Sequence, residues 1–322
     1  MIRKIGIIGS GKMGQDIFNY LNDFDFQLVW FVRNPVKKDK LEKSFLKKNT
    51  RQLKHHLITK EQFEQKIKNQ LTHDLSEVSD CDLIIETIIE NKDAKLHTFS
   101  ELKSMIGPGC MVVSNSSSIL PSWLSTDFPV AGMHFFYPIA FKNIVELVLP
   151  DNFDSDRAEG LKDFLSSINK KYVIQNERNA FLLNRFLLDL QVKAFHFTTE
   201  QNIPLQIMEN ASQTLITDFG LFEMMDHVGL ATMYQSIQNY ALLENATKKY
   251  DALLALINRR MAMEQPMLGS DSLHEVDEKL NVAVLEFLQK EIQKSYDYYF
   301  STQPHDAGAY QDALREFCGL EM

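Results

Sequence analysis

The segment KIGIIGSGKMG, residues 4–14, decides how the first half of the chain folds. A short apolar run, 4–8, leads directly into a glycine-rich turn. After the turn, apolar residues recur at the spacing of a helix, at Met13, Ile17, Phe18 and Leu21. A second apolar run covers residues 27–32. The order strand, turn, helix, strand is typical of a dinucleotide-binding unit.

Each glycine of this turn meets a separate physical demand. Gly9 permits the tight turn, Gly11 lets the backbone approach a pyrophosphate, and Gly14 lets the helix pack closely on the strand. The pyrophosphate then lies at the helix N-terminus, where the N–H groups and the helix dipole favour an anion. The predicted pyrophosphate-binding residues are therefore Gly9, Gly11, Lys12, Met13 and Gly14. The alternative is a glycine turn in a similar sheet that binds no ligand.

The end of the second strand bears on which dinucleotide binds. Units that bind NAD usually carry Asp or Glu there, because a carboxylate holds the ribose 2′-hydroxyl. Here FVRNPVKK, residues 31–38, places Arg33 and Asn34 at this point, and a one-residue shift decides which of them takes the position. A guanidinium can pair with a 2′-phosphate, so the pattern slightly favours NADP over NAD. The alternative is that Arg33 stacks on the adenine and NAD binds.

Composition limits the classes of protein that fit. The 322 residues are 44% hydrophobic and carry a net charge of −9, which argues against nucleic acid as the main partner. Three distant cysteines have no metal-ligand spacing and suit a reducing compartment. No apolar run approaches the roughly 18 residues that cross a bilayer, and the N-terminus leaves no room for a signal peptide. We expect a cytoplasmic protein with no membrane partner and no metal.

The two halves of the chain differ in periodicity. Strand patterns alternate with helical ones up to about residue 178, at 81–91, 111–115, 129–135, 143–150 and 170–176. From Ala180 onward only helical patterns occur, including long ones at 232–263 and 273–299. The predicted fold is an α/β Rossmann domain, 1–178, followed by an all-α domain, 179–322. We expect the second domain to contribute to the substrate site and to form a homodimer, and its last part is an atypical extension.

Two helical patterns at 37–56 and 60–69 form an insertion, about 36–69, in the first domain. The first pattern carries eight Lys or Arg residues among apolar ones. Such a run of charge is commonly a solvated face. The alternative is that it binds a polyphosphate of a cofactor or a substrate.

Four polar features stand out in apolar surroundings: the serines of SNSSS (114–118), His134, Glu146 and Asn184. Each has a structural explanation by itself. Ser117 could cap a helix, His134 could be a core histidine, Glu146 could form an ion pair, and Asn184 could join packed helices. An amide inside an apolar helix still needs a partner, because leaving it unsatisfied costs about 1–3 kcal/mol.

Taken together, these segments resemble the 3-hydroxyacyl-CoA dehydrogenase family, whose helical domain belongs to the 6-phosphogluconate dehydrogenase-like C-terminal domain superfamily. The similarity covers roughly residues 3–232. The matching segments occur in the family's order and spacing: GSGKMG, ETIIENKDAK (86–95), SNSSSI, HFFYPIAFKNIVELV (134–148), AFLLNRFLL (180–188) and FGLFEMMDHVGL (219–230).

The resemblance implies an oxidoreductase that interconverts a 3-hydroxyacyl thioester, such as 3-hydroxybutyryl-CoA, and its 3-keto form by hydride transfer. His134 would be the general base, and Glu146 would orient its ring and stabilise the imidazolium. Ser117 would hydrogen-bond the reacting oxygen, and Asn184 would contact the substrate. The further cofactor-binding residues implied by the resemblance are Glu90, Lys95 and Asn115.

This chain departs from the family pattern in several places. The family's HFFNP is HFFYP here, so that Tyr137 replaces an asparagine. The acid after the second strand is absent, as is the proline before the FEL-like segment. One alternative is therefore the same chemistry on a carrier-protein-bound acyl group or a free 3-hydroxy acid. An alternative of another class is a non-catalytic protein that senses NADP.

Overall fold

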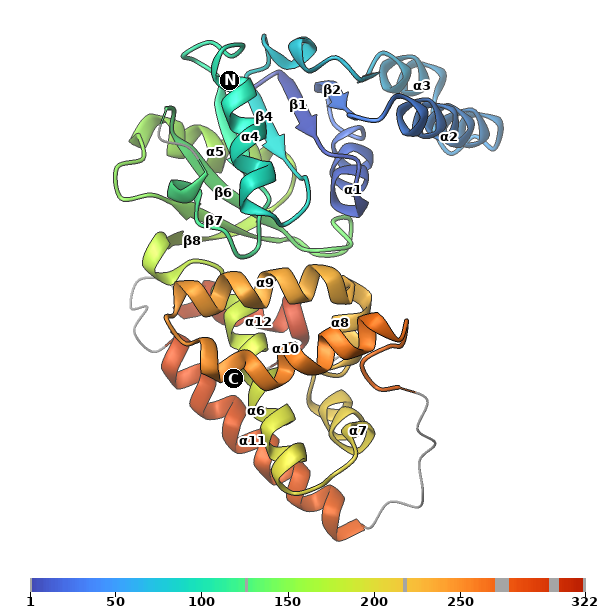
Figure 1. Cartoon of the computed structure of the whole chain (residues 1–322). Coiled ribbons are helices and arrows are strands. Elements are labelled where there is room, and N and C mark those ends of the chain that lie inside the picture. The colour runs from blue at the N-terminus through green and yellow to red at the C-terminus, as the bar shows by residue number, and fades with distance from the viewer. Residues whose placement is uncertain (1, 125–126, 217–218, 270–277, 301–306, 321–322) are drawn as a thin grey trace. The chain divides into compact units, whose positions relative to one another are not determined.

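The computed structural model describes residues 2–124, 127–216, 219–269, 278–300 and 307–320 (Figure 1). The chain divides into two compact units, Met1–Arg178 and Asn179–Met322. All of the strands in the described residues belong to the first unit, and the second unit is helical there. An α/β unit therefore precedes an all-α unit, which confirms the predicted fold class.

The first unit is built on one eight-stranded sheet with the order β3-β2-β1-β4-β5-β6-β7-β8. Neighbouring strands are parallel except β6 and β7, which run antiparallel. The strands are β1 Lys4–Ile8, β2 Gln27–Phe31, β3 Gln70–Thr72, β4 Leu83–Glu86, β5 Met111–Ser114, β6 Val130–Phe135, β7 Ile144–Leu149 and β8 Lys171–Asn176. The short β3 was not predicted, because three residues give too little periodicity to detect.

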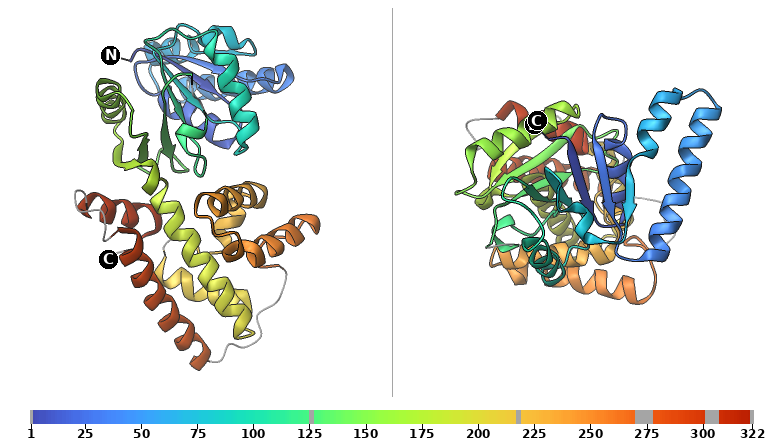
Figure 2. Two further views of the ribbon diagram at one scale, coloured as in Figure 1. Left: turned by 60° about the vertical axis from the view of Figure 1, so that its left-hand side comes forward. Right: turned by 90° about the horizontal axis from the view of Figure 1, so that it is seen from above.

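Five α-helices belong to this unit within the described residues: α1 Lys12–Leu21, α2 Pro35–Lys54, α3 Lys60–Ile67, α4 Lys92–Lys103 and α5 Ser155–Ser167. The helices α2 and α3 lie side by side and extend away from the sheet (Figure 2). Each begins with a local signal. Asn34 caps α2 and is followed by a proline at the first helical position, and Thr59 and Gln62 form a capping box on α3.

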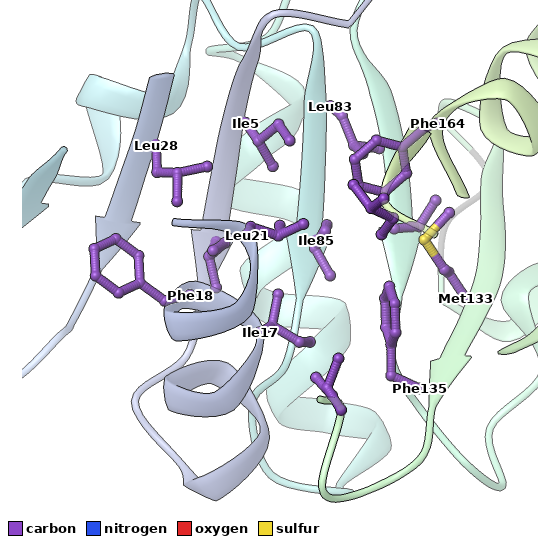
Figure 3. Close-up of a cluster of buried hydrophobic side chains, with 14 of the residues drawn as sticks. Ile5, Ile17, Phe18, Leu21, Leu28, Leu83, Ile85, Met133, Phe135 and Phe164 are labelled. Atoms are coloured by element: carbon purple, nitrogen blue, oxygen red, sulfur yellow. The ribbon is translucent and has the colours of Figure 1, made fainter. Parts of the chain in front are cut away.

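Strand residues alternate between the two faces of the sheet, and each face has its own apolar core. On one face, α1 and α5 cover the strands, and Ile17, Phe18 and Leu21 of α1 point into the cluster (Figure 3). On the other face, Phe99 and Leu102 of α4 do the same. Because helices cover both faces, the central strands are mainly apolar and buried, and a buried polar side chain on a strand needs a partner.

The second unit consists of α6 Leu182–Glu200, α7 Leu205–Leu215, α8 Glu223–Val228, α9 Leu230–Leu243, α10 Thr247–Ala262, α11 Glu278–Phe300 and α12 Ala307–Cys318. The helix α6 is buried almost all round, as predicted, because α10, α11 and α12 pack against it. The long α11 runs beside α6 (Figure 2). Its Ser295 donates a hydrogen bond to Asp189 of α6 at 2.7 Å.

The structure differs from two of the predicted helical stretches. The pattern at 232–263 is divided into α9 and α10, because Asn245 between them adopts the left-handed conformation with φ 51°. The pattern at 273–299 is helical from Glu278, and residues 273–277 lie outside the described residues. Each helix in the described ranges is too short or too polar to traverse a lipid bilayer.

Candidate active site

His134 and Glu146 face each other across neighbouring strands. They are directly paired in the antiparallel register of β6 and β7, and His134 Nδ1 lies 2.8 Å from Glu146 Oε2. Residues opposite each other in an antiparallel pair point to the same face of the sheet, so the loop that joins β6 to β7 brings the two side chains together. Glu146 is fully buried and His134 nearly so. The structure therefore joins the predicted base and its predicted orienting carboxylate.

Gln175 extends this pair on β8. Its Nε2 donates a hydrogen bond of 3.0 Å to Glu146 Oε1, so both carboxylate oxygens have protein partners. Gln175 was not among the residues predicted from the sequence, although its position carries a signal. In β8, residues 173 and 175 point inward, and an inward polar residue in an otherwise apolar register requires a partner.

The glycine turn has the geometry that a dinucleotide cradle requires. Gly9 has φ +125°, and a Cβ there would lie 2.6 Å from the Thr87 carbonyl oxygen. A Cβ on Gly14 would lie 2.3 Å from the Gly9 carbonyl oxygen, so α1 can approach β1 only with glycine at this position. No atom lies within 4 Å of a Cβ placed on Gly11, which leaves that side of the turn open to a ligand.

The N-terminus of α1 differs from those of the other α-helices described in the first unit. Asn34, Asn91 and Asp154 cap α2, α4 and α5 with side-chain oxygens. No side chain in the described residues caps α1, and its first turn carries no acidic residue. The first N–H groups of a helix have no partner within the helix, so those of α1 are available to an anion. These residues fit the pyrophosphate of a dinucleotide.

Arg33 lies in an open pocket beyond the end of β2. The pocket is lined by Phe31, Arg33, His73, Asp74, Leu75 and Glu101. The guanidinium of Arg33 is 3.0 Å from Glu101 Oε2, and both side chains are substantially exposed. Asn34 instead accepts a hydrogen bond from the Lys37 N–H as the cap of α2. Of the two predicted residues, Arg33 is therefore the one that lines the pocket. The Glu101 carboxylate would compete with a ligand phosphate for the Arg33 guanidinium.

Lys95 is buried and pairs with two carboxylates. Its Nζ lies 2.7 Å from Glu86 Oε1 and 3.7 Å from Glu90 Oε2. The side chain is only 1% exposed, so Lys95 fixes Glu90 in place rather than reaching toward solvent. Lys95 was predicted to contact the cofactor. In the structure its ammonium group instead pairs with Glu86 and Glu90.

Glu90 accepts hydrogen bonds from the serine loop that follows β5, Ser116 to Ser118. Its Oε1 accepts from Ser116 Oγ at 2.6 Å, from Ser118 Oγ at 2.7 Å, and from the backbone N–H groups of Ser117 and Ser118. Burial by itself would raise the pKa of Glu90, but Lys95 and these hydrogen bonds outweigh burial and hold the pKa below its usual value. A buried carboxylate thus shapes the loop.

Ser117 differs from its two neighbours in this loop. Ser116 and Ser118 are buried, whereas Ser117 is partly exposed, and its Oγ is 3.4 Å from Glu90 Oε1. Asn115 Oδ1 accepts a 2.9 Å hydrogen bond from the N–H of Phe135, the residue after His134. The serine loop is therefore tied to the strand that carries the histidine. The predicted roles of Ser117 at the reacting oxygen and of Asn115 at the cofactor stay predictions.

Asn184 belongs to the second unit. It lies in the first turn of α6 and is partly exposed. Its predicted contact with substrate stays a prediction. Among the described residues, no three His, Cys, Asp or Glu side chains gather in a way that could hold a metal ion.

Comparisons with known proteins agree with this geometry. Residues 4–178 match the model of the family described as 3-hydroxyacyl-CoA dehydrogenase, NAD binding domain. A 3-hydroxybutyryl-CoA dehydrogenase of Bradyrhizobium diazoefficiens is 29% identical over 247 residues, which cover 74% of this chain and 83% of the relative. The mitochondrial hydroxyacyl-coenzyme A dehydrogenase of Homo sapiens is 25% identical over 244 residues, covering 72% of this chain and 78% of the relative.

Solved structures show the same fold. The (S)-3-hydroxybutyryl-CoA dehydrogenase of Ralstonia eutropha gives a TM-score of 0.71 at 20% identity, covering 83% of this chain and 95% of that chain. A likeness at 20% identity shows only that the two chains share a fold. The family model spans more than half of the chain and includes the glycine turn, the serine loop and the His134–Glu146 pair. The chain belongs to the 3-hydroxyacyl-CoA dehydrogenase family.

Proposed function

We propose that this protein is an NAD(P)-dependent oxidoreductase that interconverts a 3-hydroxyacyl-CoA, such as 3-hydroxybutyryl-CoA, and its 3-keto form. The observation that carries the proposal is the His134–Glu146 pair, buried on the same sheet that presents a dinucleotide cradle. Relatives at 29% and 25% identity bear names of this activity, which supports the same reaction here.

In this proposal His134 moves the proton. With Nδ1 donating to Glu146, the other ring nitrogen, Nε2, accepts the proton of the substrate 3-hydroxyl, and it returns that proton in the reverse direction. Glu146 fixes this tautomer and stabilises the imidazolium that forms. A bound dinucleotide supplies the hydride acceptor or donor at its nicotinamide ring. Ser117 and Asn184 hold the substrate, with Ser117 directed at the reacting oxygen.

The surface of α2 favours coenzyme A as the acyl carrier. Exposed basic residues recur at intervals of three and four positions, which places them on one side of the helix: Lys40, Lys43, Lys47, Arg51 and Lys54. Among the described residues none of these five pairs with an acid. The phosphates of coenzyme A would bind such a face, whereas a free hydroxy acid would not use it.

A comparison of carriers tests this step. We expect Lys43→Ala/Lys47→Ala to raise the KM for acetoacetyl-CoA about tenfold and to leave the KM for acetoacetyl-pantetheine, which lacks the nucleotide, unchanged. Lys103→Ala, at the far end of α4, removes a lysine that pairs with Asp127 and is the control for loss of a positive charge outside α2. If coenzyme A itself does not inhibit and both substrates respond alike, the carrier-protein or free-acid alternative is favoured.

We further propose that the pocket around Arg33 accepts NADP somewhat better than NAD. Arg33 is the cation there, and Glu101 and Asp74 limit the preference because they oppose a 2′-phosphate. Titration with NADH and NADPH tests this, and Glu101→Gln should widen the preference for NADPH. A strong preference of the wild-type protein for NADH would contradict the proposal.

We also propose a cytoplasmic homodimer that forms through the helical unit. The buried Cys81 and Cys110 carry free thiols, which supports a reducing compartment. Light scattering of the purified protein tests the oligomeric state.

The experiment that tests the function is oxidation of reduced dinucleotide in the presence of acetoacetyl-CoA, with wild type and His134→Gln in parallel. The proposal expects turnover by the wild type and loss of turnover by the variant. Binding of dinucleotide without turnover across acyl-CoA and acyl-carrier substrates would instead support a non-catalytic, NADP-sensing protein.

A further inference from the structure

Lys12 and Tyr137 meet beside the glycine turn. The Nζ atom of Lys12 lies 3.8 Å from the centroid of the Tyr137 ring, which is a cation–π contact. Lys12 is exposed and is the first residue of α1, whereas Tyr137 lies in the loop between β6 and β7 and is 46% exposed. The contact therefore joins the start of the cradle helix to the loop that links His134 to Glu146.

The position of Lys12 is electrostatically unfavourable in the absence of an anion. The N-terminus of a helix carries partial positive charge, so a cation there is disfavoured. Among the described residues no carboxylate lies within ion-pair distance of Lys12. Asp16, one turn further along α1, accepts instead from the Ile139 N–H at 2.7 Å. An anion held by the first-turn N–H groups would be the missing partner of the Lys12 ammonium.

The loop that carries Tyr137 is fixed just after that residue by side chains from two other parts of the chain, Asp16 and Lys170. The Asp16 contact ties Ile139 to α1. The buried Lys170 donates to the carbonyl oxygens of Ile139 at 2.5 Å and Lys142 at 3.0 Å. The Tyr137 ring is thus held at a set place relative to α1, and it can keep the flexible Lys12 side chain near the helix N-terminus. Holding a long side chain in place before binding lowers the entropy cost of binding.

We infer that Lys12, held by the Tyr137 ring, binds the pyrophosphate of the dinucleotide together with the first-turn N–H groups of α1. Tyr137 is a positioning residue in this arrangement. The family pattern has asparagine at this position, which has no aromatic face to hold a cation. The inference rests on the proposed use of a dinucleotide cofactor. It makes Lys12 a pyrophosphate-binding residue that connects the start of α1 to the loop between β6 and β7.

Equilibrium titration with NADH in the absence of any acyl substrate tests the inference. We expect Lys12→Met to raise the Kd about tenfold and Tyr137→Asn about threefold, while Tyr137→Phe, which keeps the ring, leaves it nearly unchanged. In a Lys12→Met background, Tyr137→Asn should have no further effect, because the ring then has no cation to hold. Lys12→Met should also reduce the dependence of Kd on salt. Lys103→Met is the control for removal of a charge.

Several results would overturn the inference. If the Kd of Lys12→Met for NADH lies within about twofold of the wild-type value, Lys12 does not contribute to pyrophosphate binding. Equal effects of Tyr137→Asn with and without Lys12 would show that the ring acts by another route, as would a change confined to the KM of the acyl substrate. If the wild type binds NADH with the expected variant pattern but reduces no 3-keto thioester, the proposed function fails and the inference stands. Absence of dinucleotide binding overturns both.

Discussion

Replacing Glu146 by glutamine tests the central pair with little change in shape. The two oxygens of Glu146 face His134 Nδ1 at 2.8 Å and Gln175 Nε2 at 3.0 Å. A glutamine has one acceptor and one donor group, so it cannot accept from both neighbours. If its oxygen accepts from Gln175, its amide N–H points at His134 Nδ1. The imidazole proton must then lie on Nε2, where it prevents His134 from acting as a base.

The expected loss can be worked out from the geometry. Besides the wrong tautomer, the variant lacks the negative charge beside the developing imidazolium. Two charges with centres about 4 Å apart at an effective dielectric constant of about 20 interact by about 4 kcal/mol, or about 10³-fold in rate. We therefore expect Glu146→Gln to lower kcat about 10³-fold, while the Kd for NADH stays unchanged because the cradle is not altered.

The assay is dinucleotide oxidation with acetoacetyl-CoA, with circular dichroism and urea unfolding as checks that the variant is folded. The double variant Glu146→Gln/Gln175→Glu tests whether the direction of the hydrogen bonds at position 146 causes the loss of kcat. Its amide at position 146 can accept from His134 Nδ1 and donate to the new carboxylate on β8, so the tautomer is restored. We expect the double variant to recover at least about tenfold in kcat over the single variant. A wild-type kcat in Glu146→Gln would show that Glu146 neither sets the His134 tautomer nor stabilises the imidazolium.

Three further predictions concern the fold and the serine loop. Gly14→Ala should destabilise the protein by about 1–3 kcal/mol in urea unfolding, since a Cβ there meets the Gly9 carbonyl oxygen at 2.3 Å, whereas Gly107→Ala, with no atom within 4 Å, should be nearly neutral. Glu90→Gln should lower the free energy of unfolding by about 3 kcal/mol at neutral pH, because the buried Lys95 then keeps only one charged partner among the described residues, Glu86. Since the folded pKa of Glu90 is lowered, its contribution is present above its ordinary value of 4.5 and is lost as the pH falls through the lower folded value, so the wild-type and variant urea midpoints should converge in acid. Ser117→Ala should lower kcat without changing the urea midpoint, whereas Ser118→Ala should lower the midpoint, because Ser118, unlike Ser117, is a buried partner of Glu90, at 2.7 Å.

The glycine turn could be predicted from sequence because its signals are local. Turn, helix and strand follow one another within about thirty residues, and the steric demands at Gly9 and Gly14 are those that the spacing implies. The apolar periodicity also separated the α/β half from the helical half. These features depend on neighbours in sequence, which a single chain displays directly.

Contacts between distant segments were harder to foresee. The spacing of His134 and Glu146 is compatible with a pair, but only the antiparallel register of β6 and β7 places them directly opposite each other. Gln175 lies a further strand away, and its role depends on the parallel register of β7 and β8. The burial of Lys95 against Glu86 was likewise hidden, because a lysine in an amphipathic helix gives no sign of a buried partner on another element.

Charge pairing also altered the interpretation of single residues. Arg33 was predicted from its position after the second strand to bind a phosphate, and the structure adds Glu101 as a competing partner. Asn34 caps α2, a role that the following proline suggests in retrospect. The departure at Tyr137 was evident in sequence, but its cation partner Lys12 lies 125 positions earlier and became visible only in the folded chain.

The most direct test of the account follows the hydride itself. The protein is incubated with acetoacetyl-CoA and NADH or NADPH that carries two deuterium atoms at nicotinamide C4, and the product is analysed by mass spectrometry. We expect 3-hydroxybutyryl-CoA with one deuterium at its 3-carbon from the wild type. His134→Gln should form none while still binding the dinucleotide. Unlabelled acetoacetyl-CoA recovered intact from a wild-type protein that binds the dinucleotide would contradict the account, as would label transfer by His134→Gln at the wild-type rate.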